Sequence, residues 1–298
     1  MIQSHVGELS ALLVAVFWTV TALSFESAAK RVGSLPVNLI RLVLGLAFLC
    51  LLNGALRGTP LPTDASRHNW LWLVLSGMIG FVFGDLFLVK SFTLVGSWLA
   101  TLVMTLAPPL AAVFGWLILG ERISLLGVAG MALTLGGIAL AVLHRGGGGE
   151  GGRAHKPLRG ILYAFAGALG QALGIVFSKL GMQDYSPFAA TQIRVIAGIA
   201  GFSLIVTMLG RWGPVLLAFR DRKGFLAILT GSFFGPFLGV SFSLVAIRHT
   251  STGIASTLMA LVPILIIPPS ILLFRHRITL QEILGSVLGV AGVCLFFL

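Results

Sequence analysis

A few charged side chains lie within long apolar runs of the sequence, where they are the residues best suited to chemistry. Asp85 falls inside the apolar run 70–89, and Lys90 follows it closely. A charge carried into a membrane costs free energy unless it faces protein or water, so such charges often mark a transport pathway. A carboxylate at Asp85 could bind a substrate amine or a proton. The sequence leaves open the alternative of a fixed salt bridge with Lys90 or another basic group.

Two other pairs of charged residues have a structural interpretation. Glu26 and Lys30 have the i, i+4 spacing of an ion pair on one face of a helix. Arg41 and Arg194 lie near the starts of two further apolar runs. At such positions a long side chain can reach the membrane–water interface, which we take as the simplest prediction for both arginines.

No motif of a known catalytic chemistry is present, such as HExxH, a Walker loop or GxSxG. The chain has only 9 acidic residues, and its histidines lie in loops or at the ends of apolar runs. Cys50 and Cys294 lie inside apolar runs, without the spacing of a metal site. We therefore expect no catalytic residues, no metal and no cofactor.

The elements that position these charges are predicted to be transmembrane helices. Apolar residues make up 57% of the chain and charged residues 10%, with a mean hydropathy of +1.03. Soluble domains carry roughly 25% charged residues, so this composition indicates a membrane protein. The basic residues lie between apolar runs, which argues against a nucleic-acid partner. The runs are each long enough to span as helices, and they cover 9–28, 36–56, 70–89, 94–119, 125–143, 158–180, 188–209, 225–247, 252–274 and 280–298.

A polar, glycine-rich stretch near the midpoint separates five runs from five. The two halves repeat: Ile40-Arg41 matches Ile193-Arg194 at an offset of 153, and residues 100–108 match 255–263 at an offset of 155. We predict a first five-helix repeat at 1–143, a linker at 144–157 and a second repeat at 158–298. Because five is odd, the second repeat must enter the membrane from the opposite side, which gives an inverted-topology repeat.

Further features identify a family resemblance. The fourth run ends in a proline followed by a Gly-Glu-Arg turn, and a glycine-rich run comes next (Pro109, Gly120, Glu121, Arg122, Gly127, Gly130, Gly136 and Gly137). With ten short-looped helices in a 5+5 repeat, this resembles the drug/metabolite transporter superfamily and its ten-helix EamA-type exporters. The second half departs from the pattern, with Arg275-His276-Arg277 at the position of the Gly-Glu-Arg turn.

The resemblance implies a central cavity lined mainly by helices 1, 3, 4, 6, 8 and 9. It also implies substrates such as amino acids, related metabolites or small toxic organic compounds, as for bacterial amino-acid exporters, including those for aromatic amino acids. The candidate lining residues are polar, aromatic or methionine side chains within spans: Trp18, Asp85, Trp98, Thr101, Met104, Gln171, Ser178, Ser241, Ser256 and Met259. For any one of them, plain packing remains the alternative.

Candidate hinges are residues that weaken or bend a helix. Pro108 and Pro263 occupy matched positions of the two repeats, and each removes a backbone hydrogen bond. Gly80, Gly84 and Gly235 in the third and eighth helices are the other candidates. The alternative is a static bend that only shapes the bundle.

Orientation follows from the basic residues in the loops. The side that holds the linker carries 13 lysines and arginines and the opposite side 5, so the positive-inside rule predicts termini outside the cell. The family resemblance favours termini inside. We expect a secondary exporter in the bacterial inner (plasma) membrane, with a small metabolite as substrate and a proton as a candidate partner. The alternative is a membrane-embedded enzyme acting on lipid or a lipid-linked substrate.

Overall fold

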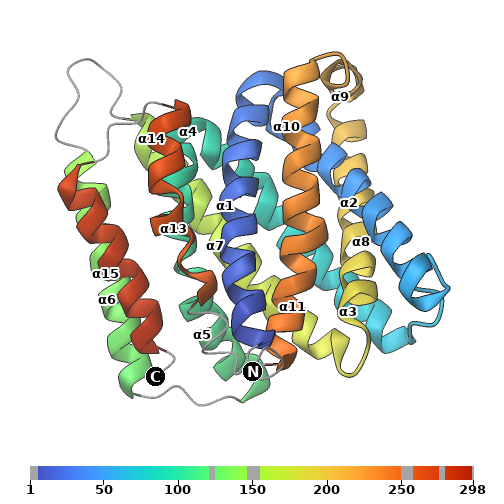
Figure 1. Cartoon of the computed structure of the whole chain (residues 1–298), viewed down its shortest axis with the longest axis horizontal. Coiled ribbons are helices and arrows are strands. Elements are labelled where there is room, and N and C mark those ends of the chain that lie inside the picture. The colour runs from blue at the N-terminus through green and yellow to red at the C-terminus, as the bar shows by residue number, and fades with distance from the viewer. Residues whose placement is uncertain (1–5, 121–124, 146–154, 250–257, 275–278, 297–298) are drawn as a thin grey trace.

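The computed structural model describes residues 6–120, 125–145, 155–249, 258–274 and 279–296, and every regular element within them is a helix (Figure 1). The first half contains α1 (Val6–Val32), α2 (Ser34–Arg57), α3 (Arg67–Gly77), η2 (Met78–Gly84), α4 (Asp85–Met104), α5 (Ala107–Leu119) and α6 (Leu125–Arg145). The second contains α7 (His155–Met182), α8 (Pro187–Met208), α9 (Trp212–Ala218), α10 (Arg222–Ser232), η3 (Phe233–Gly239), α11 (Val240–His249), α13 (Val262–Leu265), α14 (Ile267–Phe274) and α15 (Leu280–Phe296).

The lengths of the helices suit a membrane. Within the described residues, six helical segments are long and apolar enough to cross a membrane, and four shorter apolar helices accompany them. Read in chain order, they give five spans before the linker and five after it, so α7 enters from the side opposite to α1. This confirms the predicted all-α membrane fold with a 5+5 inverted repeat.

The third span is longer than the sequence predicted. The apolar run suggests an end at Val89, but helical structure continues through Lys90, whose side chain is exposed. The break comes at Gly96, where φ is 82° and only glycine fits easily. Beyond it, the backbone N–H of Ser97 donates to Oε2 of Glu26 at 2.7 Å, so a carboxylate of α1 caps the fourth span. Asp85 therefore lies deep within the third span rather than near its end.

The fourth and ninth spans are each broken just before the matched prolines. α4 ends at Met104, two turn residues follow, and Pro108 sits in the first turn of α5. In the second half, Pro263 sits in the first turn of α13. The first turn is where a helix tolerates proline, because the missing N–H would have no partner there. The structure thus shows a break at each position, while a hinge at either one remains a prediction.

The third and eighth spans each contain a π-helical turn at the same place in the repeat. η2 and η3 are both 7 residues long. η2 packs against α7 of the other half, and η3 packs against α1. The glycines make this possible: a Cβ at Gly170 would lie 2.6 Å from the Cα of Gly84, and one at Gly235 would lie 2.7 Å from Cγ2 of Thr21. Each half thus packs its π-turn on the first helix of the other half.

α6 and α15, the last spans of the two halves, pack against each other at one side of the molecule (Figure 1). A Cβ at Gly137 would lie 2.4 Å from the backbone nitrogen of Gly289, so the two backbones are nearly in contact. The hydroxyl of Thr134 donates to the backbone oxygen of Gly130 and lies 3.3 Å from that of Gly289. Close approach through small residues is typical of helix pairs in membranes.

Candidate functional site

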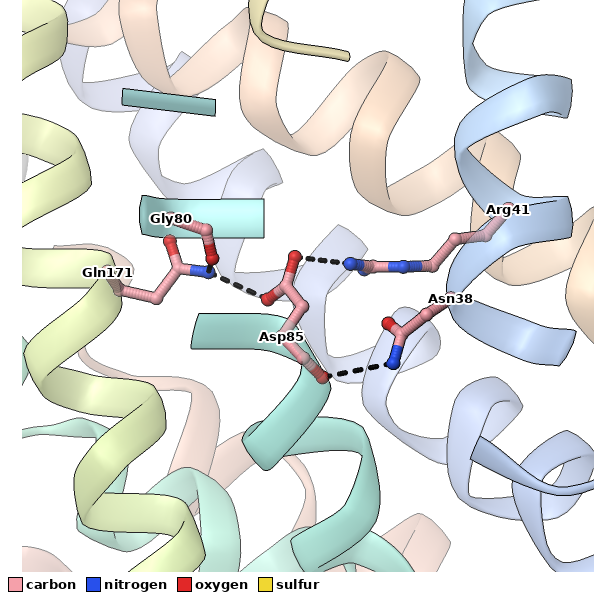
Figure 2. Close-up of polar contacts among 5 residues, drawn as sticks. All are labelled: Asn38, Arg41, Gly80, Asp85 and Gln171. Carbon is pink, nitrogen blue, oxygen red and sulfur yellow. Dashed lines mark hydrogen bonds and ion pairs between the residues drawn. The ribbon is translucent and has the colours of Figure 1, made fainter. Parts of the chain in front are cut away.

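Asp85 is the centre of a buried polar cluster, drawn in Figure 2. It directly follows η2 and is 3% exposed. Its Oδ2 accepts a hydrogen bond from Nη2 of Arg41, and its Oδ1 accepts one from Nε2 of Gln171 at 2.7 Å. Nδ2 of Asn38 donates to its backbone oxygen at 3.2 Å. Of the two salt bridges that the sequence leaves open, the structure contains the one with another basic group, because Lys90 is exposed and Arg41 is the partner.

The helices fix this geometry locally. Asn38 and Arg41 are three residues apart on α2, so both side chains lie on one helix face, toward Asp85 (Figure 2). Gln171 reaches Asp85 from α7, because the glycines of η2 let the two helices come close. Nε2 of Gln171 also lies 3.5 Å from the backbone oxygen of Gly80. The cluster therefore joins residues from both halves of the repeat.

Arg194, the repeat equivalent of Arg41, lies beside the same π-turn. Its guanidinium carbon is 4.8 Å from the centroid of the Phe81 ring. A Cβ at Gly80 would lie 3.3 Å from its Nη2. Arg41 and Arg194 are 6% and 4% exposed. The prediction that both arginines reach the interface is therefore wrong: α2 and α8 carry them inward, where a carboxylate or an aromatic ring holds them.

Among the three ionisable side chains that meet beside η2, the charges do not balance. Arg41 and Arg194 are two cations, and Asp85 is the one carboxylate that the described residues place among them. The site therefore has an excess of one positive charge when all three groups are ionised. Buried charges are usually paired, so such an imbalance is more typical of a binding site than of a packing contact.

Glu26 of α1 has a structural role. Oε1 of Glu26 pairs with Nζ of Lys30 at 2.5 Å, which confirms the predicted i, i+4 ion pair. Its other oxygen caps the fourth span at Ser97, as described above. Glu26 is fully buried, and these contacts explain why an acid stands there.

The other candidate lining residues divide into separate groups. Trp98 is buried in the main apolar core, with Met104 against it, and the hydroxyl of Thr101 donates to the backbone of Trp98. Met259 belongs to a second cluster, against which Trp18 packs.

Two of the three serines are described. The hydroxyls of Ser178 and Ser76 are 2.8 Å apart, a contact between α7 and α3. Ser241 is fully buried, and its Oγ has no hydrogen-bond partner among the described residues. Ser256 lies outside the described residues. Within the predicted lining set, a hydrogen bond between side chains joins Asp85 to Gln171, and lining by any of the set stays a prediction.

Sequence reasoning missed Asn38 and underrated the two arginines. The sequence did contain a sign that the arginines matter, since Arg41 and Arg194 occupy matched positions of the two repeats. Phe81 and the π-turn could not be singled out, because a phenylalanine in an apolar helix has no distinctive pattern.

Comparisons with known proteins agree with the fold. The model of the EamA-like transporter family matches residues 5–143 and 158–298. The "Uncharacterized transporter YvbV" of Bacillus subtilis (strain 168) is 29% identical over 191 residues, which cover 63% of this chain and 59% of that protein. An "Uncharacterized transporter" of Clostridium kluyveri is 23% identical over 291 residues, which cover 96% of this chain and 91% of that protein.

A solved structure, described as "Crystal structure of protein", has a TM-score of 0.63 at 20% identity, covering 97% of this chain and 95% of that one. This likeness concerns the fold alone. The family match extends over both repeats and agrees with the resemblance seen in the sequence. The chain belongs to the EamA-like transporter family.

Proposed function

We propose that this protein is a secondary transporter that exports small metabolites, most of all amino acids or related compounds, across the inner (plasma) membrane of a bacterial cell. On this proposal it is not an enzyme, and it works by alternating access between its two inverted halves. Family membership and the relatives described as transporters support the class of activity.

One observation carries the proposal: the buried charge cluster lies where the halves meet. Arg41 and Asp85 belong to the first half, and Gln171 and Arg194 belong to the second. Ionisable residues inside a membrane are costly and mark substrate or ion pathways. Transporters with inverted repeats place their binding sites at the boundary between repeats.

The geometry gives Asp85 a means of coupling binding to movement. Its carboxylate is held by Arg41 on one oxygen and by Gln171 on the other. A proton or a substrate amine that binds this carboxylate competes with both contacts. Because Gln171 comes from the other half, weakening the 2.7 Å bond loosens the contact between the halves. We propose that Asp85 is the group that senses the bound substrate or proton.

Counterflow in proteoliposomes tests the proposal. The purified full chain is reconstituted, preloaded with an unlabelled amino acid, and given the same compound in labelled form outside. Wild-type protein should accumulate label for at least one of the amino acids tested. Uptake no faster than in empty liposomes, for every amino acid, would contradict the proposed function.

Asp85→Asn should reduce transport by at least about tenfold, as expected when a charge-assisted hydrogen bond is lost. Asp184→Asn is the matched control, because Asp184 is exposed in the loop before α8 and should transport like wild type. Arg41 remains buried in the Asp85→Asn variant, so the double variant Arg41→Gln/Asp85→Asn removes the unpaired charge. If the double variant regains normal stability but not transport, Asp85 acts in transport. If it regains both, the pair is only structural.

A further inference from the structure

Arg194 is a buried cation that makes no ion-pair contact in the described part of the chain. It is 4% exposed, and its Nε has no hydrogen-bond partner. Asp85 is near enough to attract Arg194 electrostatically, but its two carboxylate oxygens are held by Arg41 and Gln171. Buried charges are normally paired and hydrogen-bonded, since desolvation is otherwise costly. A bound anion would pair with this charge.

The surroundings of Arg194 suit a planar anion. The guanidinium carbon lies over the ring of Phe81, and a contact of this kind takes up none of the N–H donors of the arginine. The lack of a side chain at Gly80 lets Nη2 approach η2, since a Cβ there would lie 3.3 Å from it. A carboxylate matches the fork of N–H donors with two parallel hydrogen bonds, which is the strongest common pairing of arginine.

We propose that Arg194 binds the carboxylate of the transported substrate, beside Gly80 and Phe81 of η2. This inference rests on the proposed transport function and names the chemical class of its substrate. When a carboxylate is bound, its charge and those of Arg41, Asp85 and Arg194 sum to zero. A substrate that carries only an amine would instead add a second excess positive charge. The site therefore selects carboxylates, amino acids included, over simple amines.

Matched compounds test this selectivity on the unmodified protein. The thermal unfolding temperature of the detergent-purified full chain is measured with L-phenylalanine, 3-phenylpropionate and phenethylamine, and with the corresponding leucine-derived set. We expect at least one carboxylate compound to raise the unfolding temperature, and the amine of the same set, which lacks the carboxylate, to have no such effect. Stabilisation by the amines equal to that by the carboxylates would overturn the proposal, and so would the lack of any shift with the carboxylates.

Two substitutions at Arg194 then locate the site. Arg194→Gln should weaken carboxylate binding about 10- to 100-fold, the usual effect of losing hydrogen bonds to a charged group. Arg194→Lys keeps the charge but loses the bidentate geometry, so it should bind with intermediate affinity, and it decides the question if the Gln variant does not fold. Arg211→Gln is the control, because Arg211 is exposed before α9. Equal affinity in all three variants would show that the carboxylate binds elsewhere.

The outcomes also separate this inference from the proposed function. Counterflow of amines without counterflow of carboxylates would leave a transporter and overturn the role of Arg194. Counterflow of neither class would contradict transport. A carboxylate-dependent shift that is lost in Arg194→Gln would still support the binding site in that case.

Discussion

The contact between η2 and α7 offers a test that connects helix packing to the polar cluster. Gly170→Ala adds a Cβ that would lie 2.6 Å from the Cα of Gly84 and 3.0 Å from the backbone oxygen of Ile79. Both atoms belong to the backbone, so no side chain can rotate away. Carbon atoms pack at about 3.5–4.0 Å, so α7 must move away from η2 by roughly 1 Å. Overpacking of this kind typically costs about 1–3 kcal/mol.

The displacement should also reach the site. Gln171 is the next residue, and its bond to Asp85 is 2.7 Å long. A movement of about 1 Å would stretch this contact beyond the usual hydrogen-bond range. We therefore expect Gly170→Ala to lower the thermal unfolding temperature in detergent and to reduce counterflow.

Gly136→Ala is the matched control. An added Cβ there meets nothing within 4 Å, so only helix propensity changes, in favour of alanine by about 1 kcal/mol. This variant should be at least as stable as wild type and should transport normally. If Gly170→Ala matched it in both measurements, the close contact of α7 with η2 would not position the polar cluster, and our reasoning about Gln171 would be refuted.

Three further predictions concern the ends and the breaks of the spans. A C-terminal reporter that is active only in the cytoplasm should stay silent, because the basic residues place the termini outside; a bright fusion would reverse the orientation. Pro108→Ala and Pro263→Ala should each bias cysteine accessibility toward one face of the membrane and slow transport, whereas wild-type values in both would leave the prolines as static bends. In a Tyr163→Phe variant the remaining tyrosine, Tyr185, should ionise near pH 12 rather than 10, because burial and its hydrogen bond to Asp64 raise the pKa to about 12. Ultraviolet absorbance measures this titration, and a midpoint near pH 10 would show that the bond does not persist in solution.

The same loop contact has a consequence at low pH. The hydroxyl of Tyr185 donates to Asp64, which lowers the pKa of that carboxyl below its usual value of 3.8. Since the folded-state pKa is the lower one, the contact stabilises the fold above about pH 4 and loses this effect as the pH falls through the lowered value.

Much of the fold could be predicted from the sequence, because each span is a long apolar run and the halves share matched residues. The end of the third span could not. Lys90 resembles the start of a loop, yet a long side chain can point outward from a continuing helix, as this exposed lysine does. The turn falls at Gly96, where a positive φ is required.

The site was harder to predict than the fold. Asp85 was identified because a charge within a membrane span costs free energy. Its partner Arg41 lies on a neighbouring helix, and no spacing along the chain indicates that contact. Ser178 shows a second difficulty, since its hydroxyl contacts that of Ser76 and joins two helices, a role that its place in an apolar run does not reveal. Which residues face one another depends on helix rotation, which the apolar runs do not specify.

The matched π-turns have a consequence for the origin of the molecule. η2 and η3 occupy equivalent places in two copies that now share few residues. The simplest history is a five-helix ancestor that already contained the turn and paired with an oppositely oriented copy of itself, before a gene duplication fused the two. In such a symmetric pair every residue would occur twice. Asp85 now has Val240 as its counterpart, so the present molecule holds one carboxylate where a symmetric pair would hold two.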